Sequence, residues 1–454
     1  MNPRKPAQSV VLLLGMVVSV LAVLALPDLY FHADLRAFWA WAQHWNNGWR
    51  DIYATCPDCN YPIFGMFASA GVIGAFAGLG YEKAIFIYRI LLALVDGANV
   101  WVLFQLFRKF SVPAGAVWAG VVGFSLCSWV VGALWSQIDG IDQFLILLLL
   151  LLMSSSLSEP VSPRIFTISV AVSAMLLASS LMMKQLTVFS LFPLGLLLLA
   201  SIVFYCRTWK YSLLNGCVGA AGFLLVVFAC DPFLRLPAAY VSNLYYVWKV
   251  GSGHMDVISG NGFNIWMFLG RDMWGSSHIP ILAGLPGLTP YAIGISLFVG
   301  YLLVTLASLF MFLRERFERD NQGLGAELLL NFIFFLALVN LAFNIFLTGT
   351  HERYLFHFYP YIILAWAGLG RYSPIFHKRV LPWLAVGANL YGLFVLQILS
   401  PYDFQIGTLS HLLMSAFHAV LLAYLTWQFL RYQSFPRSLA SLRRVPGTAL
   451  PDLP

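Results

Sequence analysis

The chain alternates between long apolar segments and short polar connections over most of its 454 residues. A helix that crosses the hydrocarbon core of a bilayer needs about 20 predominantly apolar residues. Segments that approach this length are 8–27, 62–80, 84–107, 112–134, 140–157, 165–183, 185–205, 211–230, 287–313, 325–347, 354–370, 380–399 and 408–430. The pattern therefore predicts an all-α polytopic membrane protein.

The positions of the basic residues predict how many of these segments cross. Arg4 and Lys5 stand near the start of the chain, and several arginines follow residue 430. Because cytoplasmic connections carry an excess of Lys and Arg, both termini are expected in the cytoplasm, which requires an even number of crossings. Segment 62–80 is Gly-rich and is the one predicted not to cross. About twelve transmembrane helices then form a single domain over 1–430, and 431–454 is predicted to be a disordered cytoplasmic tail.

This topology puts the polar clusters without basic excess on the outer side of the membrane. They are the first outer loop 28–83, residues 135–142, Lys184-Gln185, the long outer loop 231–286, residues 350–354 and residues 401–403. The first apolar segment could pass for a signal peptide, but no convincing small-residue cleavage site follows it, so we interpret it as a spanning helix. Charge counting thus predicts a functional site at the outer face.

The composition agrees with this class of protein. The chain is 60% hydrophobic and 10% charged, whereas soluble domains carry about 25% charged residues. Its net charge of +7 comes from basic residues beside apolar segments and does not indicate a nucleic-acid partner. Cys56 and Cys59 form a lone C-x-x-C, which is half a zinc site. We therefore expect no metal there, and either a local disulfide or two free thiols.

The first outer loop has helical periodicity and carries an acidic residue near its start. Its apolar residues recur at spacings of three and four, at Phe31, Leu35, Phe38, Ala42, Trp45 and Trp49. With tryptophans at 39, 41, 45 and 49, the loop is typical of an amphipathic helix at a membrane surface. Asp34 fits either a helix N-cap, which spacing alone favours, or a general base. Our hypothesis is that this loop covers a membrane-embedded site and that Asp34 is its working carboxylate.

Residues 135–142, WSQIDGID, form a polar group before a long apolar run. Asp139 and Asp142 could simply cap the following helix, because acids suit a helix N-terminus. Two acids together with Gln137 and a tryptophan exceed what a cap requires. This group is therefore a candidate for binding hydroxyl groups.

Three ionisable residues lie within or at the ends of apolar helices. Arg89 and Asp96 are seven residues apart and share a helix face. Because charges are costly at membrane depth, they are expected either to pair with each other or to line a polar cavity. Lys184 ends an apolar helix on the predicted outer side, where it could reach the interface as lysines do or contact a phosphate.

Two further outer clusters complete the set. Asn261, Asn264 and Trp266 combine amides with an aromatic ring, a mixture that suits sugars and also occurs in ordinary loops. The run 351–354, His-Glu-Arg-Tyr, separates two apolar helices and is far more polar than a connection needs. An arginine in such a run suits a phosphate group, because its planar guanidinium donates paired hydrogen bonds.

In this order the clusters resemble the GT-C glycosyltransferases, integral membrane enzymes that use lipid-phosphate sugars. The matching features are Asp34, Tyr61-Pro62, W-x-Q-x-D at 135–139, Lys184, N-x-x-N-x-W at 261–266 and HERY at 351–354. The chain is most similar to the bacterial group related to the second mannosyltransferase of GPI-anchor assembly. It departs from the family pattern at Ile63 and at His357, where the family often has proline.

The resemblance implies transfer of a monosaccharide, mannose favoured, from a polyprenyl-phosphate sugar to a hydroxyl of a glycan, glycolipid or protein. Transfer would invert the anomeric centre at the outer face of a bacterial inner membrane. Asp34 would be the catalytic base, and His351, Arg353 and Lys184 would bind the donor phosphate. Predicted sugar or acceptor ligands are Gln137, Asp139, Asp142, Asn261, Asn264, Trp266 and Tyr61, and predicted cavity-lining residues are Arg89, Asp96, Glu352 and Tyr354.

The implied partners are membrane lipid, the lipid-linked donor and the acceptor. No cofactor is required, although the acids could hold a divalent metal. The main alternative is a multi-pass transporter or lipid flippase, since twelve helices with buried charges suit one. A catalytically inactive assembly subunit is a third interpretation.

Overall fold

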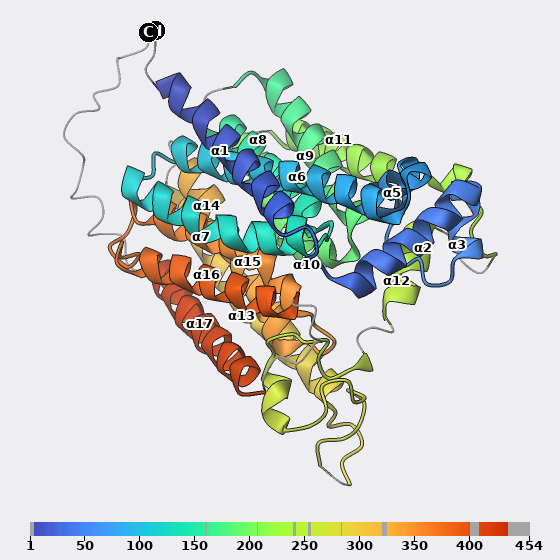
Figure 1. Cartoon of the computed structure of the whole chain (residues 1–454). Helices are drawn as coiled ribbons and strands as arrows, with labels where there is room; N and C mark the ends of the chain where they lie inside the picture. Colours follow the sequence, from blue (N-terminus) through green and yellow to red (C-terminus); the bar gives the residue numbers. More distant parts are fainter. Residues whose placement is uncertain are drawn as a thin grey trace.

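The computed structural model describes residues 4–158, 161–206, 208–238, 242–252, 256–282, 284–319, 325–399 and 408–434 (Figure 1). The regular elements in these ranges are helices, and only isolated β-bridges link their extended segments. The predicted all-α polytopic fold is therefore confirmed. Helix α17 continues to Ser434, and the remainder of the predicted tail lies outside the described residues.

The twelve segments predicted to cross a membrane are all helical. They are α1 (Arg4–Ala25), α6 (Tyr81–Lys109), α7 (Ala114–Trp129), α8 (Asp139–Ser158), α9 (Pro163–Met183), α10 (Val188–Tyr205), α11 (Trp209–Phe228), α13 (Pro290–Arg319), α14 (Gly325–Phe346), α15 (Phe358–Leu369), α16 (Val380–Ile398) and α17 (Thr408–Ser434). Within the described ranges, 10 helices are long and apolar enough to cross a membrane by length and composition. The other two predicted crossings are α1 and the 12-residue α15.

Segment 62–80 forms a broken helix. It consists of α4 (Ile63–Met66), the π-helical turn η2 (Phe67–Gly71) and α5 (Val72–Ala75). At 1.5 Å per residue these thirteen residues extend about 20 Å, well short of the roughly 30 Å hydrocarbon core. The segment is thus shorter than a crossing helix needs, but α15 is one residue shorter still, so length does not separate the two and the expectation that 62–80 does not cross stays a prediction. It packs against α2 (His32–Gly48), where the Trp45 ring lies directly against Gly71.

Helix α14 is the centre of the larger core. Every residue from Glu327 to Ile345 is buried, and α8, α10, α13, α15 and α17 all pack against it. Aromatic edges provide much of this contact, as between Phe334 and the rings of Trp366 and Phe429. A helix that is apolar on all sides belongs in the middle of a membrane bundle.

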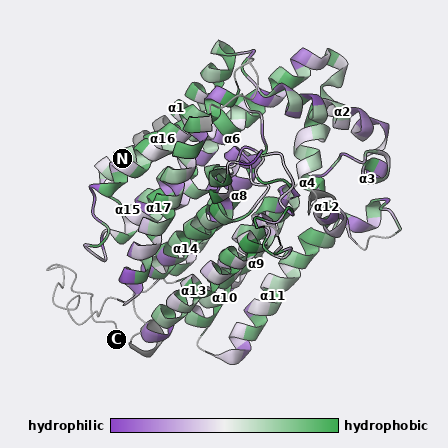
Figure 2. Cartoon of the chain, turned by 90° about the horizontal axis from the view of Figure 1, so that it is seen from below, coloured by the Kyte–Doolittle hydropathy of each residue, from purple (hydrophilic) through white to green (hydrophobic). Residues whose placement is uncertain are grey.

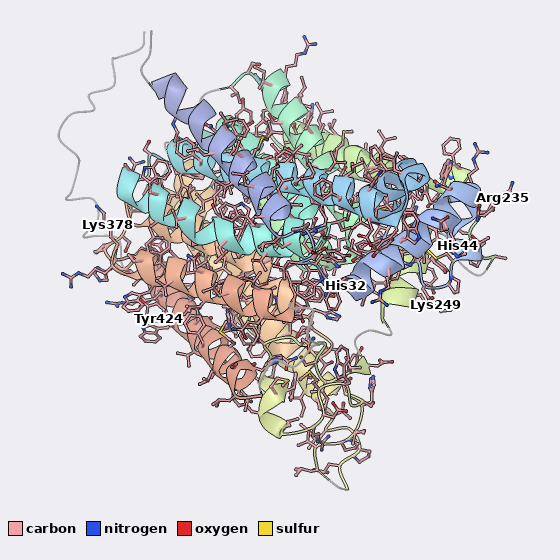
Figure 3. The ribbon with its side chains drawn as sticks, in the orientation of Figure 1. His32, His44, Arg235, Lys249, Lys378 and Tyr424 are labelled. Carbon is pink, nitrogen blue, oxygen red and sulfur yellow. A yellow bond between two sulfur atoms is a disulfide. The ribbon has the colours of Figure 1, made fainter. Side chains whose placement is uncertain are left out.

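The two ends of the bundle differ in chemistry. At one end Arg371 donates a 2.7 Å hydrogen bond to the carbonyl of Phe110, next to the basic end of α6. Figure 3 places Lys378 toward this end and His32, His44 and Lys249 toward the opposite end. Figure 2 shows mostly hydrophobic helices with hydrophilic residues gathered in loops and at helix ends. The polar clusters that the structure describes lie at the end opposite Lys378, and the predicted cluster 401–403 lies outside the described residues.

Close contact between α1 and α6 depends on a glycine. A Cβ atom at Gly97 would lie 2.6 Å from the backbone nitrogen of Met16. We expect Gly97→Val to separate the two helices and to lower stability by about 1–3 kcal/mol, as overpacking does. The thermal unfolding midpoint of the purified full-length protein in detergent measures this change.

Gly216→Val is the matched control. Gly216 also lies inside a long helix, α11, but a Cβ atom there would meet nothing within 4 Å. An equal loss of stability in both variants would show that the effect comes from valine in a helix, and that the α1–α6 contact contributes nothing.

Candidate functional site

Asp34 lies in the first turn of α2, where that helix begins beside the bundle (Figure 1). The helix starts at His32 and its N-cap position is Phe31, so Asp34 is not the cap that spacing alone favoured. Its carboxylate instead accepts a 2.8 Å hydrogen bond from the Trp135 indole and another from the Gln137 amide. Asp34 is half-buried. A carboxylate fixed by two donors and still accessible is suited to act on a bound molecule.

A sharp turn directs both of those donors at Asp34. Helix α7 ends in the π-helical segment η4 (Val130–Leu134), and Ser136 follows with φ 76°. Left-handed backbone at a non-glycine residue is unfavourable, of order 1 kcal/mol or more, and is retained where the surroundings enforce it. Both neighbours of Ser136, Trp135 and Gln137, thereby face the same carboxylate. π-Helical turns are frequent at functional sites.

Arg89 and Asp96 support this turn and do not pair with each other. Asp96 accepts hydrogen bonds from the Ser128 hydroxyl (3.0 Å) and the Ala133 amide (2.9 Å). Arg89 donates to the carbonyl of Ala133 and to carbonyls of 26–29. The two residues therefore bind backbone and hydroxyl groups in place of the predicted ion pair, and the alternative that they line a polar cavity stays a prediction. Arg89 lines a separate pocket of about 430 Å³.

Arg353 lies over the ring of Trp135. Its guanidinium is 5.4 Å from the centre of the Trp135 ring, and this ring is the one bonded to Asp34. Although burial disfavours its charged form, the nearby carboxylate of Asp34 raises the pKa of Arg353. Residues more than 300 positions apart thus meet around one indole.

The run 351–354 places the Arg353 guanidinium next to aromatic rings. Arg353 is 3.6 Å from the Glu352 carboxylate and 5.5 Å from the Tyr354 ring centre. His351 contacts the Tyr354 ring at 5.1 Å, and its backbone forms a β-bridge with Asn261. The 3₁₀ helix η9 (Glu352–His357) carries these side chains. The HERY run and the 261 loop are therefore joined, as the clusters predicted.

Next to these residues lies a buried ionic group. Lys184, between α9 and the 3₁₀ turn η5 (Gln185–Thr187), binds Asp139 at 2.5 Å. Asp142 accepts hydrogen bonds from the hydroxyls of Ser180 and Thr187. Lys184 thus faces inward to a carboxylate and does not extend to the membrane surface. Both acids have tertiary partners beyond any role as helix caps.

Tyr61 connects the first outer loop to the buried group. Its hydroxyl donates a 3.0 Å hydrogen bond to Gln137, and its ring lies 5.8 Å from the Lys184 ammonium. Cys56 and Cys59 form a disulfide, which answers the question left open by the sequence. The Tyr53 hydroxyl bonds to the Tyr61 carbonyl at 2.8 Å. These bonds fix the loop segment that carries Tyr61.

The amides of the long loop have mainly structural partners. Asn264 donates to the carbonyls of Ile258 and Leu347 and to the Thr350 hydroxyl. The indole of Trp266 donates a 2.7 Å bond to the Phe346 carbonyl. Their side chains hold the loop against the end of α14, and their contact with a sugar stays a prediction.

Several residues of the site were missed or undervalued at the sequence level. Trp135 is the ring shared by Asp34 and Arg353, and His357 lies 3.5 Å from Asp139 and 3.8 Å from Asp142. The side-chain amide of Gln143 forms a 2.9 Å hydrogen bond with Nδ1, the other ring nitrogen of His357. A histidine buried in an apolar run was the available signal. Within the described ranges, no group of three or more His, Cys, Asp and Glu side chains is arranged to hold a metal ion.

Glu352 makes the stability of the site dependent on pH. Burial raises the pKa of Glu352 from 4.5 to about 7, and Asp34 adds to this effect while Arg353 opposes it. The folded state then holds a proton that the unfolded chain releases, so stability falls as pH rises between these two values. The expected loss is about 1.4 kcal/mol per pH unit. It should appear in thermal unfolding from pH 5 to pH 8 and disappear in Glu352→Gln, which keeps the shape of the side chain.

Glu315→Gln is the control, since this acid lies at the far end of α13 outside the site. It should retain the pH dependence of the unmodified protein. The same pH dependence in Glu352→Gln would assign the effect to another group.

Together the fold and the site define a polytopic α-helical membrane protein in which carboxylates, cations and aromatic rings gather at one end of the bundle. No family model matches the sequence, and no curated protein matches it. Among solved structures it is similar to the crystal structure of ArnT from Cupriavidus metallidurans bound to undecaprenyl phosphate. The identity is 16%, the TM-score is 0.35, and the match covers 82% of this chain and 67% of that one.

Proposed function

We propose that the protein is a glycosyltransferase of the GT-C type that moves a monosaccharide, mannose favoured, from a polyprenyl-phosphate sugar to an acceptor hydroxyl. The observation that carries this proposal is that the Trp135 ring is shared by Asp34, which accepts its hydrogen bond, and Arg353, which lies over it. Lys184 lies nearby, next to the Tyr354 ring. One accessible carboxylate next to two cations is what transfer from a sugar phosphate needs: a proton acceptor for the hydroxyl and positive charge for the leaving phosphate.

An apolar groove beside the site supports a lipid-linked donor. It has a volume of about 330 Å³ and is formed by α10, α13 and the end of α14, with Trp248 from α12 (Asn243–Ser252). Gln185 and Thr348 line it, and they stand next to Lys184 and close to His351 in the chain. A prenyl tail in this groove would leave its phosphate near those cations.

The proposed reaction balances without a cofactor. The acceptor oxygen attacks the anomeric carbon while the bond from that carbon to the phosphate oxygen breaks. Asp34 takes the proton of the hydroxyl, and the phosphate leaves with the bonding electrons as a monoester. Arg353 and Lys184 offset its growing negative charge. Attack opposite to the leaving group inverts the anomeric centre.

The packing below the site favours an enzyme over a transporter. Phe356 and Phe124 stack at 5.6 Å, and both are fully buried together with Leu355 directly under the HERY run. A transporter needs a path that can open to the other side. The disulfide between Cys56 and Cys59 supports placing this end outside the cytoplasm, where disulfides persist. We assign it to the outer face of a bacterial inner membrane.

A transfer assay tests the proposal. Purified full-length protein is incubated with polyprenyl-phosphate mannose, glucose and other sugars in turn, and with a mixture of glycan and glycolipid acceptors. We expect transfer from one donor, mannose first, to give a product of inverted anomeric configuration. No transfer from any prenyl-phosphate sugar, together with uptake of lipid or solute into vesicles containing the protein, would favour the transporter.

A further inference from the structure

His357 faces the Asp139 carboxylate without completing a hydrogen bond to it. Its Nε2 atom lies 3.5 Å from one oxygen of Asp139, slightly beyond a normal hydrogen bond. Both atoms are buried, and neither has a hydrogen-bond partner among the described residues. The second oxygen of Asp139 is the one bound by Lys184 at 2.5 Å. The same carboxylate therefore has one partner in place and a second one close by.

The surroundings of His357 indicate which of its nitrogens bears hydrogen. Nε2 faces Asp139 and also Asp142, at 3.8 Å. A nitrogen lone pair directed at two carboxylates would be repelled, so Nε2 carries the hydrogen whichever way the Gln143 amide meets the other nitrogen. His357 is thus a donor directed at the pair of acids and is held in place by Gln143.

Lys184 also lies close to the aromatic rings beside Arg353. Its ammonium is 5.6 Å from the Tyr354 ring and 5.8 Å from the Tyr61 ring, and the Tyr354 ring also contacts Arg353. An arriving phosphate at Arg353 would compete with Asp139 for this ammonium. If Lys184 turned toward the phosphate, Asp139 would be left buried and unpaired, which is strongly unfavourable.

We propose that His357 is a positioning residue that takes over Asp139 when Lys184 turns to the phosphate of the lipid-linked substrate. A movement of about half an ångström would bring Nε2 to hydrogen-bond distance of Asp139. The carboxylate then keeps a partner throughout, and Lys184 is released to bind an anion. This inference rests on the proposed function, because it assumes that a prenyl phosphate binds at Arg353.

The test is a double-mutant cycle on binding of a polyprenyl monophosphate to the full-length protein in detergent, followed by tryptophan fluorescence. We expect His357→Leu to weaken binding about tenfold or more, because Asp139 then keeps Lys184. His357→Gln retains a donor and should stay within a few-fold of the unmodified protein. In the Asp139→Asn background residue 139 carries no charge that needs a partner, and Asp142 keeps its hydroxyl donors, so His357→Leu should have almost no further effect.

Each result decides a particular statement. An equal loss from His357→Leu in both backgrounds would overturn the role of His357 and leave the proposed function intact. No binding of the prenyl phosphate to the unmodified protein would overturn the proposed function and this inference together. His418→Phe, which removes another buried histidine that is bonded to Tyr359, is the control for general loosening. If His357→Leu fails to fold, the same cycle with His357→Asn decides the question.

Discussion

Asp34→Asn is expected to lower kcat for transfer from the prenyl-phosphate sugar by about 100- to 10,000-fold, with little change in KM for the donor. Loss of a positioned general base has an effect of this size. Asparagine has nearly the same shape, and its carbonyl oxygen can still accept a hydrogen bond from the Trp135 indole, which lies 2.8 Å from Asp34. The fold should therefore be retained, and steady-state kinetics at saturating donor measure the effect.

Asp51→Asn is the control from the same outer loop. Asp51 pairs with Arg235 at the surface, away from Trp135. This variant should transfer sugar at the unmodified rate. Undiminished turnover by Asp34→Asn would remove Asp34 as the base, and an equal decrease in both variants would point to damage of the loop.

Arg353→Ala is expected to reduce kcat/KM for the donor by roughly 100- to 1,000-fold, the usual range for removing a group that stabilises developing charge. The guanidinium lies over the Trp135 ring that is bonded to Asp34, and its side chain is only 11% exposed, so water replaces its charge poorly. Part of the loss should appear as weaker donor binding. Arg353→Lys keeps the charge without the planar pair of donors and should recover only part of the rate.

Arg235→Ala is the matched surface control. Arg235 is also bonded to a carboxylate, but its side chain is 74% exposed. Such exposed ion pairs contribute little, so donor kinetics should be unchanged. If Arg353→Ala weakened donor binding no more than Arg235→Ala, Arg353 would have no role in holding the phosphate.

Local sequence patterns predicted which polar residues come together more reliably than they predicted the partner of each side chain. Asp34 was best explained by spacing as a helix cap, yet α2 starts before it and its oxygen binds Trp135. Arg89 and Asp96 share a helix face, which suggested a pair, but each binds backbone near Ala133 instead. Spacing along one helix gives the direction of a side chain, whereas its partner belongs to another element that local sequence does not specify.

The sequence by itself determined the membrane class, the helical segments, the short segment at 62–80 and the set of polar clusters, because each depends on apolar length or local polarity. Only the tertiary structure decided that Trp135 joins Asp34 to Arg353, that Lys184 binds Asp139, and that His357 faces the same carboxylate. Those contacts join residues between 45 and 218 positions apart in the sequence. They arise from how the helices pack, and packing depends on the whole set of buried surfaces at once.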